Sequence, residues 1–154
     1  MHLLVTGAAG FIGSHLCERL LADGHSIVGL DNLDAFYDPA RKRANLQRLS
    51  QQGGTRFQCL EADIRDPDGL RQALVGVDAV VHLAALAGVR PSIERPLDYA
   101  EVNITGTTRL LDAMQSAGVR RLVFGSSSSV YGNQPSVPFR EIDRKSTRLN
   151  SSHT

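Results

Sequence analysis

Residues 3–13 read LLVTGAAGFIG, an apolar run that passes directly into a glycine-rich turn. The run Leu3–Thr6 has the length and composition of a strand that is buried on both faces of a parallel sheet. Glycine permits a tight chain reversal at Gly7, close approach of a phosphate at Gly10 and close helix packing at Gly13. The stretch therefore predicts a strand, a phosphate-binding turn and a helix, in that order.

An acidic residue strengthens this interpretation, because a chain with 14 glycines in 154 residues can produce such a glycine pattern by chance. The next apolar run, Ser26–Leu30, ends at Asp31, 18 residues after Gly13. A carboxylate there accepts hydrogen bonds from the adenosine ribose hydroxyls and repels the 2′-phosphate of NADP. We therefore predict an NAD site whose pyrophosphate lies at the helix N-terminus. The alternative is a structural turn followed by a surface aspartate.

Apolar runs and helical stripes alternate along the rest of the chain. Further strands are expected at 56–60, 79–83 and 121–124, and helices at 12–21, 40–51, 67–74 and 96–117. This order predicts an α/β fold, a Rossmann-like doubly wound parallel sheet with helices on both faces.

The composition excludes several functional classes. A net charge of +1 gives no basic excess for nucleic acid, and two cysteines, Cys17 and Cys59, are too few for a disulfide framework. The cysteines are expected to be small buried residues in a reducing compartment. No apolar window of about 18 residues indicates a membrane span, and the start of the chain lacks the features of a signal peptide. We expect a cytoplasmic protein without a metal site.

Six stretches occur together and in a specific order: VTGAAGFIGSHL (5–16), LDNL (30–33), ADIRD (62–66), VHLAALAGVR (81–90), VNITGT (102–107) and FGSSSSVYG (124–132). Through them the chain resembles the NAD-dependent epimerase/dehydratase family, extended short-chain dehydrogenases that act on nucleotide sugars. Residues 31–46 and 84–90 are most similar to UDP-glucuronate 4-epimerases. The resemblance covers residues 1 to about 140, and it implies an incomplete NAD-binding domain over 1–140, truncated after about five strands.

The resemblance also implies roles for individual residues. Asp63 and Ile64 would lie beside the adenine, with the Asp63 carboxylate accepting from its exocyclic amine, and Asn103 would support the loops on the cofactor side. The alternatives are an aspartate that caps a turn and an asparagine that is simply exposed. The implied cofactor-binding residues are Gly7, Gly10, Phe11, Ile12, Gly13, Asp31, Asn32, Asp63, Ile64, Leu83, Ala84, Ala85 and Asn103.

On the substrate side, the resemblance implies that Ser127 hydrogen-bonds the reacting sugar carbon's hydroxyl or ketone, with Ser129 as the second candidate. Without the resemblance, the serine run could equally be a flexible loop. Arg90 would face the substrate, although a lone arginine after a glycine is more often solvated. His82 lies inside a strand, where a hydrogen-bonded core histidine is expected rather than a catalytic one.

The family's reaction needs a base that the chain lacks. A tyrosine, its pKa lowered by a lysine four residues later, removes the hydroxyl proton while NAD takes the hydride. The resemblance implies this pair close to position 152, but no tyrosine follows Tyr131, and Glu141 stands four residues before Lys145. We also expect the family's C-terminal sugar-nucleotide domain to be absent.

From this we expect a truncated or chimeric product with a disordered, non-family tail over 144–154. We expect it to be inactive, with its last strand left as an uncovered apolar edge that invites self-association. The full-length parent would be a homodimer that binds a nucleotide sugar.

Two other functions stay open at this point. A nucleotide-sugar 4,6-dehydratase would carry an Asp-Glu pair where Ser128 and Ser129 stand, so the epimerase is favoured. A non-catalytic NAD-binding module fits the chain as it reads.

Overall fold

The computed structural model describes residues 1–132 and 138–140. The chain divides into two compact units, Met1–Phe124 and Gly125–Thr154. The predicted tail over 144–154 lies outside the described residues, so its assignment stays a prediction.

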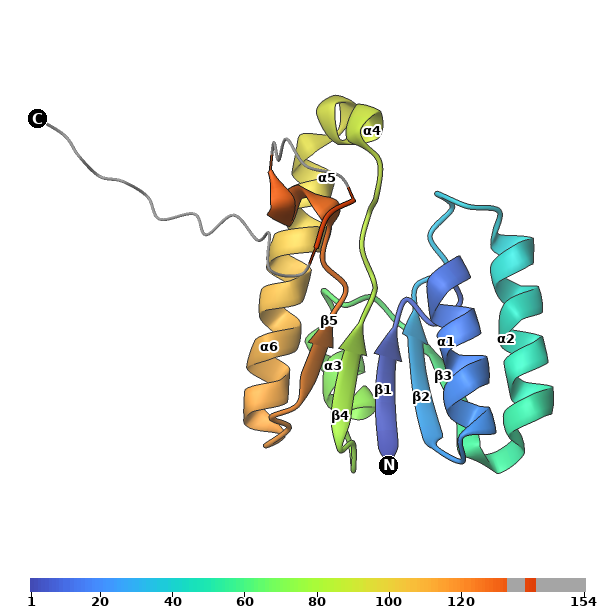
Figure 1. The fold of residues 1–154 in the computed structure, drawn as a ribbon. Helices are drawn as coiled ribbons and strands as arrows, with labels where there is room; N and C mark the ends of the chain where they lie inside the picture. The colour runs from blue at the N-terminus through green and yellow to red at the C-terminus, as the bar shows by residue number, and fades with distance from the viewer. Residues whose placement is uncertain (133–137, 141–154) are drawn as a thin grey trace, which may run out of the picture. The chain divides into compact units, whose positions relative to one another are not determined.

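A five-stranded parallel sheet forms the first unit, with strand order β3-β2-β1-β4-β5 (Figure 1). This confirms the predicted Rossmann-like α/β fold. The strands are β1 (His2–Thr6), β2 (Ser26–Asp31), β3 (Phe57–Glu61), β4 (Ala79–His82) and β5 (Leu122–Phe124). The helices of this unit are α1 (Phe11–Ala22), α2 (Pro39–Gly53), α3 (Pro67–Ala73), α4 (Val89–Glu94), α5 (Pro96–Ala100) and α6 (Thr107–Ser116), with short segments η1 (Gly54–Arg56) and η2 (Glu101–Gly106).

Helices cover both faces of the sheet. Neighbouring residues along a strand point to opposite faces, so each strand contributes side chains to both sides. In β1, Leu4 packs into one apolar cluster with residues of α3 and α6, whereas Val5 packs into the other with residues of α1 and α2. Both side chains are completely buried. The chain therefore has two apolar cores, one on each side of the sheet, as a doubly wound fold requires.

The two cysteines belong to the α1–α2 side of this arrangement. Cys17 is fully buried in its core and Cys59 packs partly buried against it, and both are free thiols. Burial raises the pKa of both thiols to about 12, so they stay protonated at neutral pH.

The predicted helix over 96–117 differs from the observed one. The structure has α5 and α6 joined by η2, a π-helical segment, and places the unpredicted α4 before them. The hydroxyls of Thr107 and Thr108 donate to the carbonyl oxygens four residues earlier, Asn103 O at 2.7 Å and Ile104 O at 2.9 Å. Such bonds compete with the α-helical pattern, so a π turn at this point has a local cause.

The last strand lies at an edge of the sheet. The exposed fractions of Leu122, Val123 and Phe124 in β5 are 36%, 62% and 53%. The prediction of an exposed apolar edge strand is thereby confirmed within the described residues, while its self-association stays a prediction.

The second unit has one short 3-10 helix among its described residues, η3 (Ser128–Tyr131). The rings of Tyr131 and Phe139 stack there, with centroids 4.9 Å apart.

Candidate cofactor site

The glycine turn connects the carboxyl end of β1 to α1 and leaves no room for side chains at two positions. A Cβ on Gly7, whose φ is +71°, would lie 2.9 Å from Ala84 N, and a Cβ on Gly13 would lie 2.1 Å from Gly7 O. Gly10 precedes α1 and contributes no side-chain cap to its N–H groups. The first N–H groups of α1 and their positive dipole end are therefore available to an anion such as a pyrophosphate.

Asp31, at the carboxyl end of β2, is 5% exposed and faces the same turn. Its Oδ2 accepts from Ala9 N at 3.1 Å, and its Oδ1 accepts from Leu33 N at 2.9 Å and Lys42 Nζ at 3.2 Å. Since each carboxylate oxygen can accept two hydrogen bonds, Oδ2 retains capacity for a ribose hydroxyl. The residue thus fits the role predicted for it.

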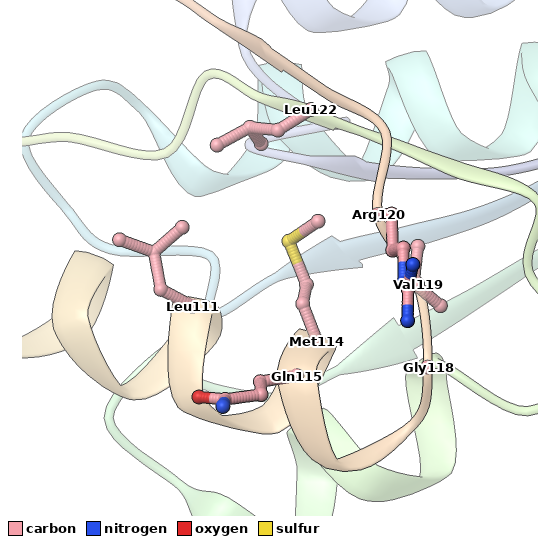
Figure 2. A pocket seen from close by; sticks show the side chains of 7 residues that line it. All are labelled: Leu111, Met114, Gln115, Gly118, Val119, Arg120 and Leu122. Atoms are coloured by element: carbon pink, nitrogen blue, oxygen red, sulfur yellow. The ribbon is translucent and has the colours of Figure 1, made fainter.

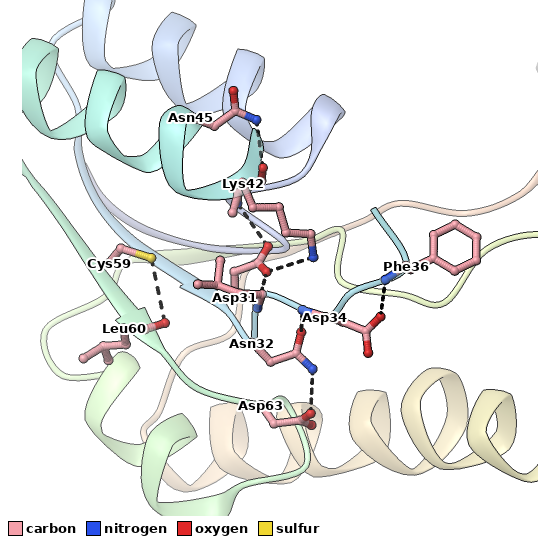
Figure 3. A network of polar contacts seen from close by, with 11 residues as sticks. Asp31, Asn32, Asp34, Phe36, Lys42, Asn45, Cys59, Leu60 and Asp63 are labelled. Atoms are coloured by element: carbon pink, nitrogen blue, oxygen red, sulfur yellow. Dashed lines mark hydrogen bonds and ion pairs between the residues drawn. The ribbon is translucent and has the colours of Figure 1, made fainter. Parts of the chain in front are cut away.

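Helix α2 adds two contacts that the sequence analysis missed (Figure 3). Lys42 forms an ion pair with Asp31, and Asn45 Nδ2 donates to Ala9 O at 2.9 Å. Lys42 and Asn45 are three residues apart, so they lie on one face of the helix. That spacing within a charged helix is the one signal that could have identified them.

Asp63 follows β3 and is held by its neighbours rather than left open. Arg65 donates to it through its backbone N, its Nε and its Nη2, each at 2.8 Å, and Asn32 Nδ2 donates to Oδ2 at 2.8 Å. The Arg65 hydrogen bonds, more than those from Asn32, lower the pKa of Asp63 to about 2. The Asp63 carboxylate is therefore ionised at neutral pH and held in one orientation. An adenine amine that donated to it would share oxygen atoms that already accept hydrogen bonds from Arg65 and Asn32.

Ile64 is 4% exposed and belongs to the core on the α3–α6 side. A Cβ built on Gly106 would lie 2.7 Å from Ile64 Cδ1, so the side chain packs against η2. The side chain is therefore a core residue, and the predicted contact of this position with adenine is not tested by the structure.

The loop after β4 is anchored at three points along its backbone. Thr6 Oγ1 accepts from Leu83 N and Ala84 N, both at 3.1 Å. Asn103 Oδ1 accepts from Leu86 N at 2.8 Å, and Asn103 Nδ2 donates to Leu86 O at 2.9 Å. Tyr99 OH donates to Ala87 O at 2.5 Å. Asn103 thus supports the loop that adjoins the glycine turn, and Thr6 and Tyr99 are supports that the sequence analysis missed.

His82 is 1% exposed and hydrogen-bonded through both ring nitrogens. Burial lowers its pKa, which favours the neutral ring. The expectation of a hydrogen-bonded core histidine is confirmed.

The structure does not test the roles predicted for the substrate-side residues. Arg90 lies in α4 with its side chain 92% exposed, and its Nε is 3.4 Å from Glu94 Oε1. Ser127 is exposed in the second unit. The side chain of Ser129 lies outside the described part of the structure.

A separate pocket of about 470 Å³ lies between α6 and the start of β5 (Figure 2). Strands begin at the edge of the sheet opposite to their carboxyl ends, so this pocket is remote from the glycine turn. Its lining residues are Leu111, Met114, Gln115, Gly118, Val119, Arg120 and Leu122.

Two other features bear on function. Within residues 1–132 and 138–140, no group of three or more His, Cys, Asp or Glu side chains is arranged to hold a metal ion. Among the helices described, none is both long and apolar enough to cross a membrane.

The doubly wound sheet, the glycine turn and the buried aspartate define a dinucleotide-binding protein of the Rossmann class. The model of the NAD dependent epimerase/dehydratase family matches residues 3–153, which includes most of the segment predicted as a non-family tail. The chain belongs to the NAD-dependent epimerase/dehydratase family. Membership of an NAD-dependent family confirms the cofactor class predicted from the turn and Asp31.

Three relatives illustrate the similarity. A UDP-glucose 4-epimerase of Klebsiella pneumoniae is 42% identical over 92% of this chain and 99% of that protein. UDP-glucuronate 4-epimerase 4 of Arabidopsis thaliana is 43% identical over 92% of this chain and 32% of its own length. The crystal structure of a UDP-glucuronic acid 4-epimerase from Bacillus cereus, in complex with UDP-glucuronic acid and NAD, is 40% identical with a TM-score of 0.80. It covers 88% of this chain, and the chain covers 43% of it.

The chain thus spans less than half of the two UDP-glucuronate 4-epimerases but nearly all of the Klebsiella protein. The predicted resemblance to UDP-glucuronate 4-epimerases is confirmed, with sequence identities of 43% and 40% to these two proteins.

Proposed function

We propose that this chain is the NAD-binding part of a nucleotide-sugar 4-epimerase whose parent enzyme acts on UDP-glucuronate. The observation that carries the proposal is the buried Asp31 carboxylate, which accepts from Ala9 N in the glycine turn that precedes α1. The similarity to 4-epimerases of UDP-glucose and UDP-glucuronate supports the reaction class. We further propose that the parent is a cytoplasmic homodimer.

The residues present would divide the cofactor among them. The N–H groups at the start of α1 would bind the pyrophosphate, Asp31 the adenosine ribose and Asp63 the adenine amine. Phe11 and Ile12, 77% and 67% exposed at the first turn of α1, would cover the phosphates. The anchored loop with Leu83, Ala84 and Ala85 would pass beside the cofactor backbone. When bound there, NAD would supply the acceptor for the hydride of the sugar carbon.

On the substrate side, Ser127 would hydrogen-bond the reacting hydroxyl or ketone, with Ser129 as the second candidate. Arg90 would contact the nucleotide sugar from α4. Serines at 128 and 129, where a 4,6-dehydratase would carry an acidic pair, support the epimerase over the dehydratase.

Turnover by these residues alone is not expected. A hydroxyl group loses its proton slowly without a positioned base, and no Tyr-xxx-Lys pair follows Ser127 in the sequence. We therefore propose that residues 1–140 contribute the NAD domain and that the chain binds NAD without epimerising a nucleotide sugar.

Two measurements with the purified 154-residue chain test this. The first is NAD binding by calorimetry, and the second is conversion of UDP-glucuronate and UDP-glucose in the presence of NAD. We expect binding without conversion. Measurable conversion would overturn the proposed inactivity, and failure to bind NAD would overturn the proposed cofactor role.

The alternative of a non-catalytic NAD-binding module is distinguished by the gene. An open frame beyond the codon for Asp143 that encodes Tyr-xxx-Lys and a further domain supports the epimerase. A stop codon after Thr154 in independent reads supports the module.

A further inference from the structure

Three side chains and one backbone carbonyl form a hydrogen-bonded chain from the end of β1 to η2 and the start of α6. Thr6 Oγ1 lies 2.6 Å from His82 Nδ1, and His82 Nε2 lies 3.0 Å from Thr107 Oγ1. The Thr107 hydroxyl donates to Asn103 O at 2.7 Å, and the Asn103 side chain holds both backbone groups of Leu86. We call Thr6, His82, Thr107 and Asn103 the His82 relay.

The direction of each hydrogen bond in the relay is fixed by counting donors and acceptors. Thr6 Oγ1 already accepts from Leu83 N and Ala84 N, so its own hydrogen must be donated to His82 Nδ1. A ring nitrogen that accepts a hydrogen bond carries no proton, so the proton of the neutral imidazole is on Nε2.

The other half of the relay agrees with this assignment. Thr107 donates its hydrogen to Asn103 O, so its oxygen is an acceptor toward His82 Nε2–H. Every donor in the relay thus has an acceptor when the ring is neutral and protonated on Nε2. No other tautomer satisfies both threonines.

The relay ends on the backbone that closes the cofactor turn. A Cβ on Gly7 would lie 2.9 Å from Ala84 N, so Ala84 and the glycine turn are in direct contact. An outward or inward movement of Leu83 and Ala84 therefore changes the space above Gly7. Leu83 N is shared between Thr6 Oγ1 and the backbone oxygen of Thr6, at 3.1 and 3.2 Å, whereas the one printed partner of Ala84 N is Thr6 Oγ1. The position of the Thr6 side chain therefore matters most for Ala84.

We propose that His82 is a positioning residue for the cofactor site: as the Nε2–H tautomer, it links η2 and α6 to Thr6 and so holds residues 83–86 in the arrangement that NAD binding requires. The part of this inference that concerns NAD rests on the proposed function. The part that concerns residues 83–86 depends only on the chain without NAD.

Three substitutions of His82 distinguish the effect of its hydrogen bond with Thr6 from the effect of its hydrogen bond with Thr107. The side-chain oxygen of His82→Asn can replace Nδ1 as the acceptor from Thr6, whereas the terminal amide of His82→Gln can replace Nε2–H as the donor to Thr107. His82→Leu retains neither. Met114→Ala, in the core on the α3–α6 side and outside the relay, is the control for general loss of packing.

The experiment is amide hydrogen exchange followed by NMR on the full chain without NAD. In His82→Leu, the amides of Ala84 and Leu86 should exchange about 5- to 30-fold faster, the change expected for an unsatisfied buried donor, and Leu83, which also donates to Thr6 O, should change less. The amides of β1 and β2 should change much less. His82→Asn should restore slow exchange at Ala84 only, and His82→Gln at Leu86 only.

Two results would overturn the inference. One is an increase in exchange that is uniform across β1, β2 and the loop, as expected for Met114→Ala. The other is identical behaviour of His82→Asn and His82→Gln. If His82→Leu fails to fold, the Asn and Gln variants still decide between the outcomes.

A titration of the same variants with NAD completes the test. We expect NAD affinity to fall in the same order as loop protection, lowest for His82→Leu. If the wild-type chain does not bind NAD, the proposed function fails, whereas the exchange pattern still decides the relay. If it binds and the variants bind equally well, the positioning role is wrong.

Discussion

The two flanks of the sheet differ in how complete they are. On the β1–β2 flank, the side chains of Leu4 and Val5 are completely buried, and the strands end in the glycine turn and Asp31. On the β5 flank, Leu122, Val123 and Phe124 are between one third and two thirds exposed. The next residues along the chain, including the serine run, belong to a separate unit.

This difference agrees with the proposed function. The proposed contacts to the pyrophosphate and the adenosine ribose come from α1 and Asp31, on the flank that packs most completely. The proposed contacts to the substrate come from residues after β5 and from Arg90. Binding without turnover is the expected consequence, and the following predictions test the contrast between the flanks.

The largest effect is expected from Gly13→Val on the complete flank. A Cβ there would lie 2.1 Å from Gly7 O, and neither backbone segment can move without separating α1 from β1. The free energy of unfolding should fall by about 4 kcal/mol or more, as for severe overpacking. Denaturant unfolding measures this.

Gly24→Ala, at the other end of α1, is the control. A Cβ on Gly24 meets nothing within 4 Å, and its φ of +86° is the sole source of strain. We expect a loss of about 1 kcal/mol. Equal losses for the two glycines would show that close packing at the turn is not important.

A pair of truncations compares the flanks directly. Leu4→Ala removes a completely buried side chain and should cost about 3 kcal/mol of unfolding free energy. Val123→Ala removes one that is 62% exposed and should cost less than about 0.5 kcal/mol. Urea midpoints of the two variants measure the difference. A large loss for Val123→Ala would mean that β5 is covered in solution, for example by self-association.

A smaller effect is expected from pH. Burial lowers the pKa of His82 from its ordinary value of 6.5, so below that value the unfolded chain takes up a proton that the folded chain excludes. The contribution of His82 should therefore destabilise the fold as the pH falls through 6.5. Thermal unfolding of the wild type and of His82→Gln between pH 8 and pH 5 isolates it, and parallel curves for the two proteins would refute it.

The succession of strands and helices along the chain, the glycine turn and Asp31 could be predicted because their signals are local. Apolar runs identify strands, and a glycine at a fixed distance from a strand end identifies the turn. Asn103 was predicted from the resemblance alone, and the structure adds its contact with Leu86. The roles of Ser127 and Arg90 stay predictions.

Other features could not be predicted because they depend on contacts between distant segments. Lys42 and Asn45 look like ordinary polar residues of a charged helix until α2 is placed beside the turn. The π segment depends on the hydroxyls of Thr107 and Thr108 and on the packing of Ile64 against Gly106. A uniform helical pattern over 96–117 conceals all of these causes.

The most direct test of the central claim is a calorimetric titration of the chain with NAD and with NADP. We predict that NAD binds at least about tenfold more tightly, a difference of about 1.4 kcal/mol, because the Asp31 carboxylate accepts from the ribose and repels a 2′-phosphate. Asp31→Asn should lose this preference, whereas Asp34→Asn, an exposed control in the same loop, should keep it. Equal affinity of the wild-type chain for the two dinucleotides, or no affinity for either, would contradict the account.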